Sequence, residues 1–375
     1  MKENAIAGWS QDQHLFNQRL GIRPLNALRT FFPDDEYTGM MDMLYYGGDL
    51  FDFFLDAPAT DERIEAVMNY MGWRLEQSVK HGYGVRVLKG TPYHDREQNQ
   101  MWNTVNGILG NKADFKYVDT LSIEIHPVMG SILYIPDEWK PTPDETWSDV
   151  VEIMRVHSLT QVDWIIMHGA FKFQIPEHLH SKIECLHDEK RYSAICRKYC
   201  LVGHVHNKGQ WKNIISIGSL DRKAFGEEEP KGVLRIECSP NGDNLTFIEN
   251  TLARVMPTIN VVGRPFNDVI KEINNIVENN DPEYLSIRLL GTKLDEVYLN
   301  MDAIIKRFEP AEIVFKDQDA KAKKNPLSKL NQIDLKDDKV DLSAKSVQKM
   351  LKDRIGDQLT ETIEDKIQIL FKDYK

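Results

Sequence analysis

Five short motifs of histidine and aspartate occur in order along the N-terminal part of the chain. They are Asp12-Gln13-His14, Gly48-Asp49, His94-Asp95, His168-Gly169 and Gly203-His204-Val205-His206. Imidazole nitrogens and carboxylate oxygens together favour Mn²⁺, iron or Zn²⁺ over Mg²⁺ or Ca²⁺. Each motif alone is more simply explained as a surface turn or a core histidine. Because all of them follow short apolar runs, their joint occurrence predicts a single site that holds metal ions.

A site of this composition suits the hydrolysis of a phosphodiester bond. Two divalent cations roughly 3.5–4 Å apart lower the pKa of a bridging water, whose hydroxide is the nucleophile, and neutralise the attacked oxygens. Asp12 and His14, two residues apart at an expected strand end, can face the same ion, and Asp49 is the natural bridging carboxylate. The remaining ligands are expected to be the histidines His168, His204 and His206.

The third motif supplies the candidate for proton transfer. We expect His94 to orient the phosphoryl group or to protonate the departing oxygen, with Asp95 or a neighbour fixing its tautomer. The other histidines lack such a context and are expected to be structural: His81, His126, His157, His178, His180 and His187. The cysteines are expected to be small buried residues rather than zinc ligands, since Cys196 and Cys200 lie too close to the H-x-H motif for a zinc module.

The motifs need elements that bring them together, and short apolar runs predict the strands that do so. These runs end in Gly, Asp or His and cover residues 5–9, 42–48, 85–90, 164–169, 199–204 and 213–218. Residues 61–81 have the apolar spacing of a helix, with Thr60 as the expected N-cap. We therefore expect residues 1–250 to form an α/β domain with its ligands just past the strand ends.

The character of the sequence changes near residue 255. Residues 251–318 predict a β-α-β-α-β unit of the size of a small domain, without a metal-ligand cluster. Residues 319–342 are rich in Lys and Asp, which predicts a solvated linker. Residues 343–375 have apolar residues at helical spacing, and such a tail either packs back on the protein or binds a partner.

The overall composition limits the class of protein. A hydrophobic fraction of 41% in 375 residues fits a soluble protein, and no apolar run approaches the roughly 20 residues that cross a bilayer. The N-terminus lacks the apolar stretch of a signal peptide, so an intracellular location without membrane contact is expected. The net charge of -11 argues weakly against a generic nucleic-acid binder, because a local basic strip can exist on an acidic protein.

The motifs resemble those of the calcineurin-like metallophosphoesterases, whose pattern is D-x-H, G-D, G-N-H-D/E, H and G-H-x-H. The segments GGDLFD (47–52) and 218–237 resemble those of SbcD-type DNA repair nucleases. The resemblance covers nearly the whole chain. Residues 251–318 correspond to a DNA-capping domain, and residues 319–375 correspond to the segment that grips the coiled-coil base of an SbcC-type ATPase.

The resemblance implies a four-layer β-sandwich flanked by helices, with a small α+β capping domain and a helical tail. It implies two divalent ions, Mn²⁺ above all, and exonuclease and endonuclease cleavage of DNA in a bacterial or phage-infected cell. By resemblance, one ion would be held by Asp12, His14 and His206, with Asp49 bridging. His168 and His204 would hold the second ion, and His94 would be the transition-state histidine. A homodimer through the phosphoesterase domain is implied as well, with residues 15–32 and 96–111 expected to form helices there.

The third motif departs from the family pattern. The chain has Gly90-Thr91-Pro92-Tyr93-His94 where G-N-H is expected, so the metal-binding Asn is missing. Tyr93 is a poor replacement, because the pKa of a phenol is about 10. Thr91, a backbone carbonyl or a water are the candidates for the vacant ligand position.

Two other functions compete with the nuclease. One is a small-molecule phosphodiesterase or a protein phosphatase of the same superfamily, which needs neither a capping unit nor an amphipathic tail. The other is a weakly active scaffold that tethers DNA to the ATPase. The sequence singles out no DNA-contacting residues.

Overall fold

The computed structural model describes residues 5–318, except residues 38, 57–60, 138–139, 141 and 184. The expected linker, 319–342, and the expected helical tail, 343–375, lie outside the described residues. The described part is an α/β structure of mixed sheets and helices, which confirms the expected fold class at that level. None of its helices has both the length and the apolar character that crossing a bilayer requires.

The first sheet has six strands in the order β14-β13-β1-β2-β3-β4. Strands β1 to β4 are parallel, β13 pairs antiparallel with β1, and β14 pairs antiparallel with β13. The strands are β1 (Ala5–Ser10), β2 (Met41–Tyr46), β3 (Gly84–Leu88), β4 (Phe115–Val118), β13 (Gly232–Cys238) and β14 (Asn244–Glu249). Parallel pairing puts the carboxyl ends of β1, β2 and β3, and the motifs that follow them, at one edge of the sheet.

The second sheet also has six strands, in the order β11-β12-β10-β7-β6-β5. Strands β6, β7, β10 and β12 are parallel, and β5 and β11 pair antiparallel at the two edges. The strands are β5 (Ser122–His126), β6 (Gly130–Ile135), β7 (Val162–His168), β10 (Cys196–Gly203), β11 (Gly209–Trp211) and β12 (Ile214–Ser216). His168 ends β7 and His204 follows β10, so these two neighbouring strands present their histidines together.

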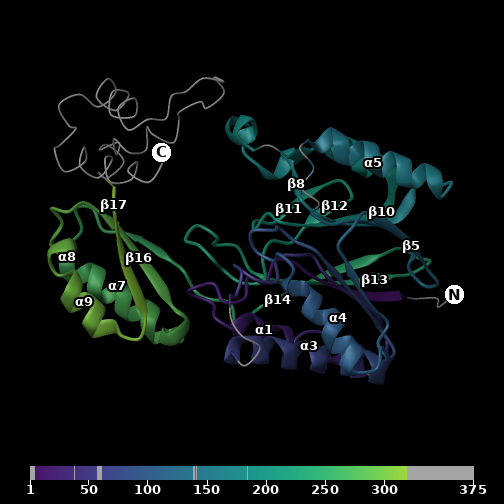
Figure 1. Ribbon diagram of the computed structural model, residues 1–375. Coiled ribbons are helices and arrows are strands. Elements are labelled where there is room, and N and C mark those ends of the chain that lie inside the picture. Colours follow the sequence, from purple (N-terminus) through teal and green to yellow (C-terminus); the bar gives the residue numbers. More distant parts are fainter. Residues whose placement is uncertain are drawn as a thin grey trace, which may run out of the picture.

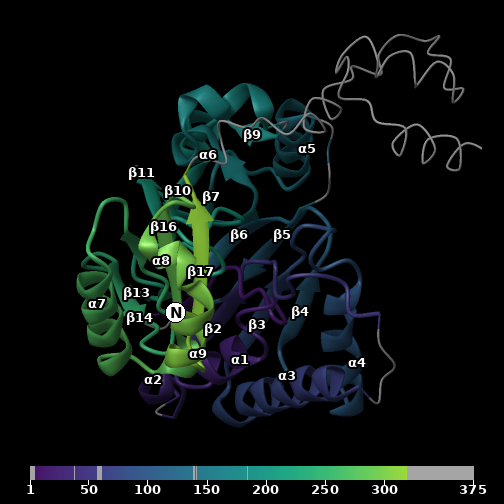
Figure 2. The same cartoon turned by 90° about the vertical axis from the view of Figure 1, so that its left-hand side faces the viewer.

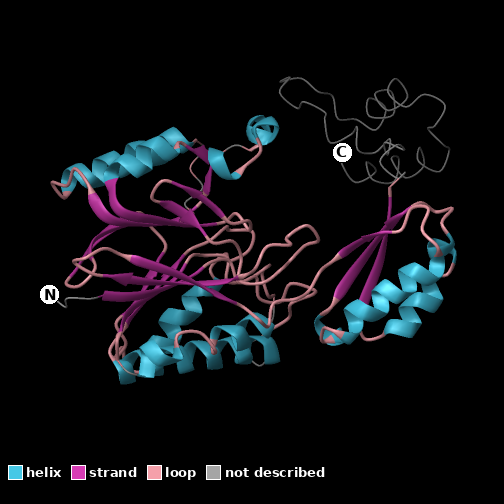
Figure 3. Ribbon diagram, turned by 180° about the vertical axis from the view of Figure 1, so that it is seen from behind, coloured by secondary structure: helices cyan, strands magenta, loops and turns pink. Residues whose placement is uncertain are grey.

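The two sheets face each other across one apolar core. Trp9 and Tyr45 from the first sheet meet Tyr134 and Trp164 from the second. Helices cover the outer faces, so that helices, sheet, sheet and helices follow one another in space (Figure 3). The covering helices are α3 (Glu62–His81) and α4 (Met101–Ile108) on the first sheet and α5 (Pro143–Val156) and α6 (Glu189–Ile195) on the second.

The long helix α3 forms where the apolar spacing predicts it. Ile64, Val67, Met71 and Leu75 are buried against the first sheet. The N-cap is Asp61, whose side chain accepts a hydrogen bond from the N–H of Arg63, and not the expected Thr60, which lies outside the described residues.

The remaining helices of the sandwich are short. The helix expected within residues 15–32 is confined to its last part, because Phe16 and Gly21 have positive φ angles of 66° and 52° that a helix cannot contain. The short elements are α1 (Arg23–Leu28), α2 (Pro33–Tyr37), η1 (Gln98–Gln100), β8 (Ala170–Phe171), η2 (Lys172–Gln174), η3 (Glu177–Lys182) and β9 (Leu186–His187).

A smaller unit with its own apolar core lies beside the sandwich (Figures 1 and 2). Its three parallel strands and its helices follow the β-α-β-α-β order expected from the sequence. They are β15 (Thr258–Asn260), α7 (Phe266–Glu278), η4 (Pro282–Tyr284), β16 (Ser286–Gly291), α8 (Glu296–Leu299), α9 (Met301–Phe308) and β17 (Glu312–Asp317). Polar groups join the two parts: Arg19 Nε donates to Glu312 at 2.9 Å, and Arg254 Nε donates to Ser286 Oγ at 2.7 Å.

Candidate metal centre

The carboxyl ends of five strands from both sheets bring the motif residues into one cluster. Within the described residues, two groups of side chains have nitrogen or oxygen atoms close enough together to share an ion. One group is His14, Asp49 and His94, and the other is Asp49, His168 and His204. Asp49 belongs to both groups, which is the position that a bridging carboxylate requires.

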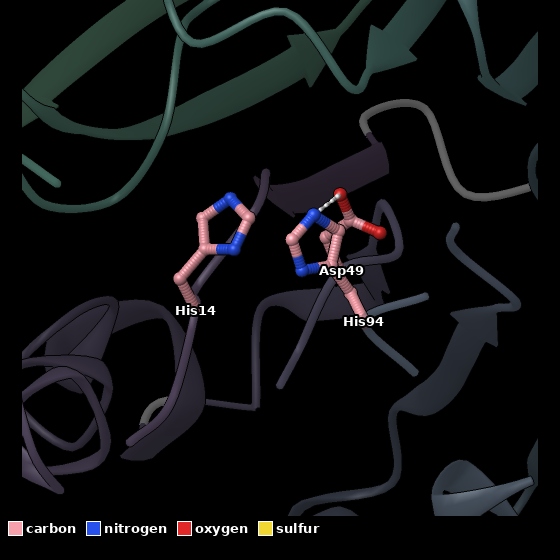
Figure 4. Close-up of side chains that lie close together, drawn as sticks. All are labelled: His14, Asp49 and His94. Atoms are coloured by element: carbon pink, nitrogen blue, oxygen red, sulfur yellow. Dashed lines mark ion pairs between the residues drawn. The ribbon is translucent and has the colours of Figure 1, made fainter. Parts of the chain in front are cut away.

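The first group lies at the ends of β1, β2 and β3. The rings of His14 and His94 face the same space as the Asp49 carboxylate (Figure 4), and His94 Nε2 is 4.0 Å from Asp49 Oδ2. His206, from the other sheet, reaches this group because its Nε2 is 2.8 Å from His14 Nε2. Two imidazole nitrogens that point at one another in this way are well placed to hold the same cation.

The second group joins the two sheets. His168 Nε2 is 3.4 Å from Asp49 Oδ1 and 3.2 Å from His204 Nδ1. The other nitrogen of His168, Nδ1, is 2.7 Å from the carbonyl oxygen of Gly47, which accepts a hydrogen bond from it and leaves Nε2 facing the cluster. A hydrogen bond from the distal ring nitrogen is the usual way in which a metal-binding histidine is oriented.

Asp12 lies behind these groups and not in either of them. It is fully buried, and its Oδ2 accepts a hydrogen bond of 2.8 Å from the backbone N–H of His204. Its other oxygen, Oδ1, has no hydrogen-bond partner among the described residues and is 3.8 Å from His168 Nδ1. A buried carboxylate oxygen without a donor is costly unless a cation or a water satisfies it.

The Thr91 side chain reaches the second group. Its hydroxyl oxygen is 3.2 Å from His168 Nε2, 3.3 Å from His204 Nδ1 and 3.3 Å from Asp49 Oδ2. Its backbone N–H also donates to Asp49 at 2.6 Å. Tyr93, in contrast, is 70% exposed. Of the candidates that the sequence left open for this position, the threonine side chain is the one that faces the second group.

The structure corrects the expected role of Asp95. Its carboxylate accepts backbone hydrogen bonds from Phe51 and Gly90, at 3.1 and 3.0 Å, and a side-chain bond from Asn99 at 2.8 Å. Asp95 therefore holds two loops together instead of contacting the His94 ring. The group that fixes His94 is the backbone carbonyl of Asp52, 2.5 Å from Nδ1.

Four further charged residues orient the ligands, and the motifs did not reveal them. Glu227 Oε1 is 3.2 Å from His206 Nδ1, and Lys231 neutralises Glu227 at 3.0 Å. Asp52 is 3.3 Å from His14 Nδ1 and forms an ion pair with Lys223 at 3.1 Å. The signals in the sequence were the resemblances to SbcD-type segments, that of residues 47–52 for Asp52 and that of residues 218–237 for the other three.

The loop that carries these residues also reaches the smaller unit. Phe225 lies beneath two guanidinium groups, that of Arg19 at 5.6 Å and that of Arg288 on β16 at 4.9 Å. The same loop is anchored by Asp221, which accepts a hydrogen bond of 2.7 Å from the N–H of Arg254. It therefore touches the histidine ligands at one point and β16 at another.

Burial and charge set the protonation of the cluster. Burial opposes ionisation of Asp49, but the surrounding histidines, His168 first, lower its pKa to about 2. Burial likewise opposes protonation of His168, but Asp49 and Asp12 raise its pKa to about 9. Burial lowers the pKa of both His14 and His204. The metal-free site therefore contains an ion pair between Asp49 and His168 and, at neutral pH, two unprotonated imidazoles.

The backbone is strained at the cluster. Asp12, His14, Asp49 and His204 have positive φ angles of 39°, 51°, 47° and 104°. Such angles are uncommon outside glycine and accumulate at functional sites. The strand ends therefore hold these side chains in one cluster at some cost in local conformation.

One glycine of the motifs is required by close packing. A Cβ atom at Gly90 would lie 2.1 Å from the backbone nitrogen of Asp49 and 2.4 Å from its Oδ1. The motif glycine therefore lets the β3 loop approach the Asp49 carboxylate.

A cavity of about 350 Å³ opens beside the second group. Its lining includes Thr91, His168 and His204 together with Asp137, Lys140 and Cys185. His187, expected to be structural, is buried at this cavity, with its Nε2 3.6 Å from Cys185 Sγ and its Nδ1 3.1 Å from the Tyr192 hydroxyl. Burial lowers the pKa of His187 to about 4.

Comparisons with known proteins leave the family undetermined. No family model matches the chain, and no curated protein matches it. Among the solved structures that match, one crystal structure aligns with 67% of this chain and with 100% of its own, at 10% sequence identity and a TM-score of 0.37. A similarity of this size carries no functional argument, so the function is inferred from the cluster itself.

Proposed function

We propose that the protein is a two-metal-dependent phosphodiesterase that acts as the DNA nuclease subunit of an SbcCD-like repair or recombination complex. The observation that carries the proposal is the position of Asp49, whose carboxylate belongs to two groups of ligands at once. A single-ion site or a structural zinc site has no need of such a shared carboxylate. The proposal extends the sequence expectation, because the five motifs do converge in space.

The donor set fits a pair of divalent cations. No donor among the described residues reaches the buried Asp12 Oδ1, and the Nε2 atoms of His14 and His206 point at one another across 2.8 Å. Mixed imidazole and carboxylate donors suit Mn²⁺ better than Mg²⁺ or Ca²⁺. The residues that would hold the ions are Asp12, His14, Asp49, His168, His204 and His206, with the Thr91 hydroxyl on the second.

The chain's own residues have separate tasks in this reaction. The ions, when bound, would supply an activated water and neutralise charge on the phosphoryl oxygens. His94 presents its Nε2 to the space above Asp49, while the Asp52 carbonyl holds the ring from the other side. A proton held on Nε2 can pass to the departing oxygen. Asp52 and Glu227 keep His14 and His206 turned toward the same space.

The smaller unit favours DNA over a small phosphoester. Beside its two facing sheets, the chain has a smaller unit with an apolar core of its own, and the resemblance in sequence assigns this segment to a DNA-capping domain. A small-molecule phosphodiesterase or a protein phosphatase has no need of that unit. An SbcC-type ATPase and a second copy of the chain remain the proposed protein partners.

The test is cleavage of a labelled linear duplex by the full chain with Mn²⁺, with and without a coiled-coil ATPase partner. Cleavage should stop with a chelator and fall by roughly 10²- to 10⁴-fold in His94→Ala, the usual range for a general acid. His157→Ala is the matched control, because this exposed histidine follows α5, where its side chain bonds to the carbonyl of Ile153.

The outcomes separate the competing functions. Metal-dependent cleavage of small phosphodiesters but of no DNA would favour the small-molecule enzyme. DNA processing by the complex that is unchanged in Asp49→Ala and His94→Ala would favour the scaffold and would contradict the proposal.

A further inference from the structure

Exposed aromatic side chains gather beside His94. In the described part of the chain, the large aromatic side chains that are more than a third exposed are Phe53, Phe54, Tyr93 and Tyr298. The first three, which we name the aromatic rim, belong to the two loops that carry Asp49 and His94. Their exposed fractions are 37%, 40% and 70%. Apolar rings exposed to water cost free energy, and their concentration at one site calls for a ligand.

Hydrogen bonds fix the aromatic rim to the metal centre. The Gln98 side chain donates to the carbonyl of Phe53 at 3.1 Å and accepts from the N–H of Leu55 at 2.8 Å. The Tyr93 ring stands edge-on to the His94 ring, with 5.4 Å between the ring centres. Because His94 is itself held by the carbonyl of Asp52, the rim and the proposed proton donor form one connected surface.

A cation completes the aromatic rim. The guanidinium of Arg96 lies over the Phe54 ring, 4.8 Å from its centre, and the Arg96 side chain is exposed. Arg96 has a positive φ of 41°, an uncommon conformation for arginine. A planar cation above an aromatic ring, next to a site for phosphoryl groups, offers both stacking and charge to a nucleotide.

We propose that the aromatic rim stacks unpaired nucleobases adjacent to the phosphodiester that is cut. Every base has a π-face, so aromatic side chains bind single strands with little regard to sequence. Bases inside a duplex are already stacked on their neighbours and cannot offer a face to Phe54 or Tyr93. The preferred DNA at this site is therefore a single strand or a frayed end. This inference rests on the proposed nuclease function and adds a preference for strand state.

The experiment measures binding of the full chain to a labelled oligothymidylate and to a duplex of equal length, with Ca²⁺ in place of Mn²⁺. Phe54→Ala and Tyr93→Ala should each weaken single-strand binding by about 5- to 150-fold, the range for loss of one stacked base. Duplex binding should change by less than about threefold. Tyr93→Phe keeps the ring and should bind like the wild type, whereas Phe54→Leu keeps only the apolar surface and should not.

Ile125→Ala is the control, since Ile125 is an exposed apolar residue on the antiparallel edge strand β5. A 2-aminopurine in the oligonucleotide should lose fluorescence on binding to the wild type and keep it with the two alanine variants. Equal binding by wild type and rim variants would refute the proposal, as would parallel losses for single strand and duplex. A dimer that dissociates in Tyr93→Ala would also overturn it, because the rim would then be an interface between copies.

Different experimental results would refute the proposal for the aromatic rim and the proposal for the nuclease. If rim variants bind two Mn²⁺ ions, cleave DNA and bind single strands as the wild type does, only the base-stacking role of the aromatic rim is refuted. A wild-type chain that stacks 2-aminopurine through Tyr93 but binds no Mn²⁺ would refute the nuclease and leave the rim in place.

Discussion

Replacing Thr91 by valine removes one hydroxyl from the metal centre and keeps the shape of the side chain. The hydroxyl is within 3.3 Å of donor atoms on Asp49, His168 and His204, which are the three members of the second group. A hydrogen bond from a neutral group to a charged one contributes about 1.5–3 kcal/mol. We therefore expect Thr91→Val to weaken the binding of the second ion by roughly 10- to 150-fold. The affinity for the first ion should change by less than about threefold, because Asp49 is the one member of the first group that the Thr91 hydroxyl contacts.

The assay is a Mn²⁺ titration followed by electron paramagnetic resonance or calorimetry, which resolves two binding steps without relying on turnover. Thr91→Ser restores the oxygen and should recover the second step. Thr91→Asn introduces the amide oxygen that the family pattern has at this position and should bind the second ion more tightly than the wild type. If Thr91→Val binds both ions as the wild type does, the hydroxyl plays no part in holding the ion and the reasoning from its contacts is wrong.

Three further outcomes are expected. Glu227→Gln should weaken Mn²⁺ binding about 10- to 100-fold by releasing His206, as is usual for partners of metal-binding histidines, and equal affinity would contradict this role. Because the pKa of His168 is raised to about 9, its proton competes with the metal, so Mn²⁺ affinity should rise roughly tenfold per pH unit between pH 7 and 9; an affinity that is flat over this range would show that His168 binds no ion. The pKa of His187 is lowered to about 4, so the folded state favours the neutral form of this side chain. Its contribution to the free energy of unfolding is complete above pH 6.5 and is lost as the pH falls toward 4. Urea unfolding of the metal-free protein should show about 2 kcal/mol lost between pH 6.5 and 5 that His187→Gln does not lose, and parallel losses in both proteins would contradict it.

The sequence predicted those parts of the centre that depend on local order. Apolar runs that end in Gly, Asp or His predicted the strand ends, and parallel pairing then placed Asp49, His168 and His204 together. The β-α-β-α-β order of the smaller unit was predictable for the same reason, because each of its elements has a clear apolar period. The local spacing of apolar residues therefore predicts which helices and strands form and at which residues they end.

The remainder depends on contacts between distant segments, which no local pattern contains. Glu227 orients His206 from a loop 21 residues further along the chain. The role of Asp95 was predicted wrongly because adjacency to His94 suggested a contact, whereas the loop turns the carboxylate toward the N–H groups of Phe51 and Gly90. Thr91 was one of several candidates until the fold showed which oxygen reaches the second group.

The loop from Asp221 to Lys231 has a consequence for communication across the molecule. One stretch of backbone carries Glu227, which orients His206, and Phe225, which is held against Arg288 of the smaller unit. A rotation of that unit would displace Arg288 and change the support of the loop, and with it the orientation of the His206 imidazole. The position of the smaller unit would in this way control the geometry of the His206 side chain through direct mechanical contact.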